Sequence, residues 1–182
     1  MYFLNHKSEV FEKFRHFKNL VEKQSGHYIK VLRTERDGEY ISKEFLRFCK
    51  ENDIQKQFTT RYTPQQNNVA ERKNRTIMDM VRSMLKAKHF PNEYWVEAAN
   101  CAAYILNRCP PKVVMNRVSE EAWSGIKQHV THMRVFGCVA YAHIPNQLRK
   151  KFDSKGEKCI LLDTVKNQRH IDCITHSLRS FL

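Results

Sequence analysis

The first sixty residues alternate between short strand-like runs and amphipathic helical segments, and this alternation limits the folds open to the chain. Residues 8–26 place apolar side chains at helical spacing, with Gly26 as the stop. Residues 28–32 and 54–60 suit strands, and Ser42 can cap a helix between them. Strands that alternate with helices predict an α/β domain with a partly parallel sheet.

Two further helices are predicted downstream of this alternation. We expect a loop over residues 61–68, because Pro64 and two consecutive asparagines interrupt the periodicity. A long amphipathic helix then begins at about Val69. The next helix opens at Pro91 and ends before Pro110.

Beyond the helices the pattern changes to strand-like runs around a basic turn, which predicts a small β module. The predicted organisation has four parts: a partial α/β core at 1–111, a linker at 112–128, the β module at 129–163 and a divergent tail at 164–182.

The composition favours a polyanionic partner. Lys and Arg total 32 against 19 acidic residues, which gives a net charge of +13, and contacts to phosphates release condensed counterions. No apolar run approaches the roughly 20 residues of a membrane span, so DNA is favoured over a membrane. The six cysteines include no C-x-x-C pair and indicate reduced thiols. We expect a protein that works inside the cell, with the nucleus as its destination if it acts on chromosomal DNA.

Two glutamates stand out in this basic chain. Glu35 follows the strand at 28–32, where open α/β sheets place their ligand sites. Glu71 falls in the predicted first turn of the long helix, among basic residues, and 35 residues separate it from Glu35. Each has an ordinary explanation as well. Glu35 suits a solvated turn, and Glu71 suits a partner of the helix dipole.

The segments LRTERDGEYISKEF and FTTRYTPQQNNVAERKNRTIMDMVRSML resemble the catalytic core of copia-type retrotransposon integrases. The resemblance continues to about residue 162 through EYWVEAANCAAYILNRCP, EEAWSG and MRVFGCVAYAHIPNQLRKKFDSKGEKCI. That family belongs to the RNase H-like nucleotidyltransferases with a D,D-35-E triad. The resemblance implies an RNase H-like α/β core that lacks its first strands, followed by a small SH3-like β module.

The resemblance also implies roles for individual residues. Glu71 matches the family's helix glutamate, and Glu35 stands where the family has its second aspartate. Both would be catalytic ligands of Mg²⁺ or Mn²⁺, in a pair of ions about 3.5–4 Å apart that serves DNA strand transfer. Partners would be duplex DNA and further integrase chains, identical or not. The residues implied to contact DNA are Arg61, Tyr62, Gln65, Gln66, Asn67, Lys73 and Arg75.

Two departures from the family pattern indicate impaired catalysis. The family reads Asp-Asn-Gly where this chain has Glu35-Arg36-Asp37. The glutamate extends its carboxylate by one carbon–carbon bond, about 1.5 Å, and Arg36 adds a competing positive charge. The family's first aspartate would lie upstream of MYFL, which reads as the end of a strand. The sequence therefore leaves three interpretations open: an integrase enzyme, a non-catalytic nucleic-acid-binding module, and a decayed remnant that folds poorly.

Overall fold

The computed structural model describes residues 1–34, 38–58, 64–109, 117–162 and 173–174. The chain divides into two compact units, Met1–Arg75 and Thr76–Leu182. Among the described residues, no helix is long and apolar enough to cross a membrane.

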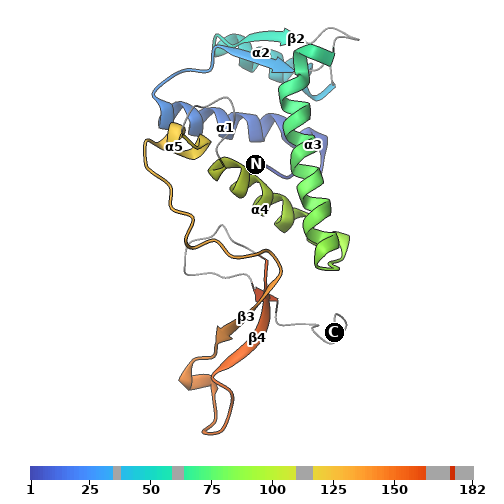
Figure 1. Ribbon diagram of the computed structural model, residues 1–182. Helices are drawn as coiled ribbons and strands as arrows, with labels where there is room; N and C mark the ends of the chain where they lie inside the picture. The colour runs from blue at the N-terminus through green and yellow to red at the C-terminus, as the bar shows by residue number, and fades with distance from the viewer. Residues whose placement is uncertain (35–37, 59–63, 110–116, 163–172, 175–182) are drawn as a thin grey trace. The chain divides into compact units, whose positions relative to one another are not determined.

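A pair of parallel strands organises the first unit. β1 pairs with β2 in parallel, with Val31 opposite Gln55 and Thr34 opposite Phe58. Figure 1 shows the two strands side by side with α2 next to them. This arrangement confirms the predicted α/β class and its parallel strands. The elements of the unit are η1 (Lys7–Glu9), α1 (Val10–Ser25), β1 (Val31–Thr34), η2 (Gly38–Tyr40), α2 (Lys43–Glu51), β2 (Gln55–Phe58) and the first half of α3 (Pro64–Ala87).

Two helix boundaries predicted from the sequence are confirmed by their capping geometry. Gly26 ends α1 in the left-handed conformation, with φ +68°, and its N–H donates to the Glu22 carbonyl. Ser42 caps α2, because its hydroxyl accepts a hydrogen bond from the Phe45 N–H at 3.2 Å. The residue types at these two positions therefore fix where the helices start and stop.

Two other predictions about local structure are wrong. Residues 1–4, read as the end of a strand, have no regular structure. Residues 64–68, predicted as part of a loop, are helical, since α3 begins at Pro64 and not near Val69. Proline suits the first turn of a helix, because its φ is already helical and its missing N–H would have no partner there. Pro64 therefore starts the helix that it was expected to interrupt.

The core of the first unit is centred on Phe45, whose exposed fraction is 0%. The rings of Phe11 and Phe14 on α1 lie 5.6 and 5.2 Å from its ring. Tyr40 on η2 lies 5.6 Å away, and the buried residues Cys49 and Ile54 complete the cluster. Phe45 thus joins α2 to α1 and to the segment that follows β1.

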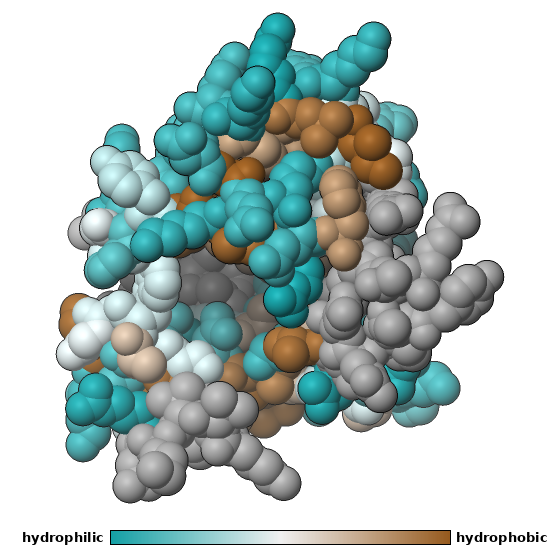
Figure 2. All heavy atoms as spheres, turned by 90° about the horizontal axis from the view of Figure 1, so that it is seen from above, coloured by the Kyte–Doolittle hydropathy of each residue, from teal (hydrophilic) through white to brown (hydrophobic). Residues whose placement is uncertain are grey.

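Apolar side chains also remain on the surface of this unit. Val31, Ile41 and Leu46 are exposed. In the view of Figure 2, hydrophobic surface lies among hydrophilic side chains. The described part of the unit therefore leaves some apolar surface in contact with water.

The second unit combines helices with an antiparallel sheet in the strand order β3-β4-β5. Ala98, Ala99 and Ala102 of α4 are buried, as are Cys159 and Leu161 of β4. β5 falls within the segment that we predicted as a divergent tail. The elements are the second half of α3, η3 (Asn92–Tyr94), α4 (Trp95–Arg108), α5 (Ser119–Ser124), β3 (Cys138–His143), η4 (Asn146–Leu148), β4 (Gly156–Leu161) and β5 (Cys173–Ile174).

Gly137 sets the start of β3. It has φ +73°, and its N–H donates to the Leu161 carbonyl at 2.8 Å. A Cβ at this position would come within 2.5 Å of the Phe90 ring. Phe90 in turn lies 5.7 Å, ring to ring, from the buried Phe136. The close approach of Phe90 therefore requires glycine at residue 137.

We expect Phe45→Ala to lower the free energy of unfolding by about 3–5 kcal/mol, because it removes the ring on which the core of the first unit is centred. Tyr28→Ala is the matched control, since Tyr28 belongs to the same unit and is 81% exposed. Urea denaturation followed by circular dichroism measures both variants. Equal stability of the two variants would contradict this description of the core.

Candidate carboxylate and nucleic-acid site

The parallel pairing of β1 and β2 places the carboxyl ends of both strands at one edge of the sheet. Thr34 and Phe58 are the last paired residues of the two strands and lie opposite each other. Glu35 follows Thr34 directly, and residues 59–63 lead from Phe58 into α3. The topology therefore starts both segments of the predicted site from the same edge. Glu35, Arg61 and Tyr62 themselves lie outside the described residues.

The described residues on both sides of the segment 35–37 are packed. Thr34, just before it, is 8% exposed. Tyr40, just after it, packs against Phe45, and its carbonyl accepts a hydrogen bond from the Lys56 ammonium. The Ile41 N–H also donates to the Gly38 carbonyl at 3.2 Å. The residues that flank the segment are therefore held by the fold.

Lys56 is a half-buried cation that the sequence analysis did not single out. Its Nζ lies 4.8 Å from the centre of the Phe45 ring and 5.1 Å from that of Phe58. Burial lowers the pKa of Lys56, because the charged ammonium loses hydration, and interaction with Cys49 acts in the opposite direction. Burial also raises the pKa of the Cys49 thiol. The signal available in the sequence was a lysine two positions before an aromatic residue on the same strand, and the contacts indicate a structural role.

Glu71 is exposed on α3. Contrary to our prediction, it does not lie in the first turn of this helix. Because α3 begins at Pro64, Glu71 comes about two turns into the helix. The helix dipole acts mainly within the first turn, so it gives little reason for a glutamate at this position. Among the described side chains, none forms an ion pair with Glu71.

The helix geometry separates the basic residues near Glu71. Lys73 and Arg75 are both exposed. Arg75 comes four residues after Glu71 and shares its face, whereas Lys73, two residues after, points to the opposite side. Gln65, Gln66 and Asn67 belong to α3 by backbone, but their side chains lie outside the described residues. The structure thus brings Glu71 and Arg75 together on one face and leaves Lys73 off it.

The described residues do not by themselves fit a divalent metal ion. Within these residues, no group of three or more His, Cys, Asp or Glu side chains could hold one. Glu71 is a single carboxylate, and magnesium bound by proteins normally takes several oxygen ligands in near-ideal octahedral geometry. The donor set implied by the resemblance is therefore not assembled by the described part of the chain.

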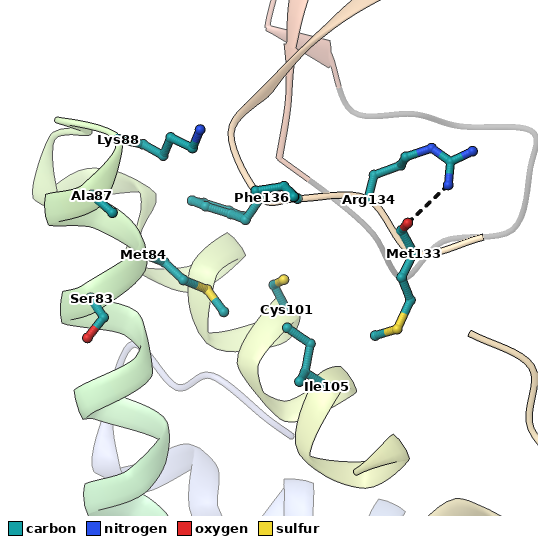
Figure 3. A pocket seen from close by; sticks show the side chains of 10 residues that line it. Ser83, Met84, Ala87, Lys88, Cys101, Ile105, Met133, Arg134 and Phe136 are labelled. Carbon is teal, nitrogen blue, oxygen red and sulfur yellow. Dashed lines mark hydrogen bonds between the residues drawn. The ribbon is translucent and has the colours of Figure 1, made fainter. Parts of the chain in front are cut away.

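A pocket of about 600 Å³ lies within the second unit. Figure 3 shows Met84, Cys101 and Ile105 from two helices facing Met133 and Phe136. The Arg134 side chain turns back to the Met133 carbonyl, at 3.0 Å. The lining includes no carboxylate, so this pocket does not supply the missing metal ligands.

Comparisons with known proteins agree with the motifs. Residues 138–174 match the family described as "Retroviral polymerase SH3-like domain". The chain is 41% identical over 162 residues to the retrovirus-related Pol polyprotein from transposon TNT 1-94 of Nicotiana tabacum, a match that covers 89% of this chain and 12% of that protein. It is 28% identical over 174 residues to the corresponding polyprotein from transposon RE1 of Arabidopsis thaliana, covering 96% of this chain and 12% of that protein.

A likeness of fold extends to a solved structure. It is the simian T-cell lymphotropic virus intasome in complex with PP2A regulatory subunit B56 gamma, with a TM-score of 0.51 and 13% sequence identity. The match covers 86% of this chain and 55% of that chain.

The chain combines an integrase-like α/β core with a retroviral SH3-like module. It corresponds to the region of copia-type Pol polyproteins that covers these two parts. It spans 12% of the length of the curated relatives given above. The SH3-like match runs to residue 174, past the end that we predicted for the module at 163.

The exposure of Glu71 and its lack of an ion pair among the described side chains predict that its replacement will not change the stability of the fold. We expect Glu71→Gln to change the free energy of unfolding by no more than about 0.5 kcal/mol, as is usual for exposed positions without specific contacts. Urea denaturation measures this. A loss above about 1 kcal/mol would instead assign Glu71 a role in the fold.

Proposed function

We propose that this chain is an integrase-derived unit that binds duplex DNA along one face of α3 and is impaired in strand transfer. The observation that carries the proposal is the parallel pairing of β1 with β2. It starts the Glu35 turn and the segment leading to α3 from one edge of the sheet. Homology to the integrase region of copia-type Pol polyproteins supports the same reading.

The DNA-binding part of the proposal rests on charge and on helix geometry. A chain with net charge +13 attracts a polyanion at long range. Arg75 supplies an exposed guanidinium on the same face as Glu71, and arginine can bind a phosphate through two parallel hydrogen bonds. The resemblance adds residues at 61–67, which lie between β2 and Glu71 in the sequence. Lys73, on the opposite side of α3, would then contribute little to this contact.

The impaired chemistry rests on the residues at the end of β1. Glu35 stands in place of an aspartate, and a carboxylate displaced by about 1 Å can slow a reaction by about a hundredfold. Arg36, the next residue in the sequence, adds a positive charge that would compete with divalent cations. The resemblance implies Mg²⁺ or Mn²⁺ bound by Glu35 and Glu71. Of these two ligands, only Glu71 is among the described residues.

The remaining parts of the proposal concern assembly and location. One solved structure with a similar fold is an intasome, and we infer that this chain also acts together with other integrase chains, identical or not. Its target would be chromosomal DNA, which places its action in the nucleus.

The DNA contact can be tested by single substitutions on α3. We expect Arg75→Gln to flatten the log–log dependence of affinity on salt by about 0.9, as for the loss of one phosphate contact. Lys73→Gln is the matched control, since it removes the same charge two residues away and should leave the slope unchanged. Fluorescence anisotropy with a labelled duplex, over a salt series, measures both variants. Equal slopes for the two variants would overturn the one-face assignment.

Catalysis is tested separately from binding. We expect the wild-type chain to give no more strand-transfer product than Glu71→Gln, with either Mg²⁺ or Mn²⁺, while both proteins remain folded by circular dichroism. Gel analysis of a labelled donor duplex joined to a target plasmid measures the product. Product from the wild-type chain that Glu71→Gln abolishes would show an active enzyme and contradict the impairment.

A further inference from the structure

The edge of the SH3-like sheet presents a row of backbone groups. β3 lies at one end of the strand order, and within the described residues it pairs only with β4. The Ile144 N–H donates to the Lys155 carbonyl at 3.1 Å. Because hydrogen-bonded pairs alternate along an antiparallel ladder, this bond sets which residues of β3 face β4. The N–H and C=O groups of Val139, Tyr141 and His143 therefore point to the other edge.

The side chains of the same three residues are exposed. Val139 is 53% and Tyr141 is 72% exposed, and His143 is exposed as well. On β4, Ile160 lies opposite Val139 and Lys158 lies opposite Tyr141. Since directly opposed residues share one face of a sheet, this face combines apolar, aromatic and cationic groups. A partner that pairs with the edge can reach these side chains too.

The hairpin around this edge is basic. Residues 143–158 contain five Lys or Arg residues and two acidic ones. One of the acidic residues, Asp153, already accepts a hydrogen bond from the Lys150 N–H at 2.7 Å. The charge therefore favours a negatively charged partner and disfavours a second copy of this chain, which carries +13.

We propose that the open edge of β3 binds an acidic, extended polypeptide segment of another protein, which adds to the sheet as a further strand. Unpaired edges are templates for such additions, and backbone bonds then supply affinity while alternate side chains supply specificity. A polypeptide can pair with the N–H and C=O groups of residues 139, 141 and 143, which a nucleic-acid strand cannot do as a ladder. A bilayer would leave those groups without partners in hydrocarbon.

The test uses the full chain and a synthetic peptide of alternating Glu and Val with blocked ends. Hydrogen exchange of individual amides is followed by NMR with and without the peptide. We expect saturating peptide to slow exchange at Val139, Tyr141 and His143 at least tenfold, and to leave the amides of α4 unchanged. The same peptide with N-methyl groups on alternate amides keeps its charge and side chains but cannot complete the ladder, so it should bind at least tenfold more weakly.

A matched pair of variants tests the protein side. Val139→Pro removes an outward N–H and is tolerated at a strand edge, so it should weaken peptide binding about tenfold or more. Val139→Thr keeps the N–H and should bind like the wild type. Equal binding of the methylated and unmethylated peptides would reduce the contact to charge alone and overturn the proposal. Protection of the same three amides by duplex DNA but not by the peptide would assign the edge to nucleic acid and also overturn it.

Discussion

The packing around Phe45 is the interaction on which the first unit depends. Its ring contacts aromatic residues from α1 and from η2, and the ammonium of Lys56 on β2 lies over it. One side chain of α2 therefore holds a helix, a strand and the residues that follow β1. Tyr40, which follows the segment that contains Glu35, is packed by this cluster. The residues that follow the Glu35 segment are thus held by a hydrophobic core on α2.

The structure separates the scaffold of the site from its chemistry. The scaffold is present in the described residues, as parallel strands followed by a long helix with Glu71 exposed on it. The donors are not assembled there, and Glu35 departs from the family's aspartate. A fold of this kind can keep its basic helix and its DNA contact after its catalytic geometry has changed, because the two depend on different residues. This is the physical basis for proposing binding with impaired strand transfer.

The sequence predicted a helix boundary correctly where a single residue type determines it. Gly26 and Ser42 end and begin helices because few other residues suit those positions. Pro64 was misread, because proline both breaks a helix and starts one, and only the tertiary structure decides which applies. That error moved Glu71 into the first turn and gave the dipole explanation more weight than it deserves. Lys56 and the open edge of β3 depend on pairing between distant segments, which no local pattern contains.

The central claim is that DNA lies along the Glu71 and Arg75 face of α3. Covalent footprinting tests it most directly, with arginine- and lysine-modifying reagents applied with and without duplex DNA and read by mass spectrometry. The account predicts that DNA protects Arg75 from modification while Lys73, on the opposite side of the same helix, stays reactive. Equal protection of the two residues, or protection confined to the basic hairpin at 143–158, would contradict it.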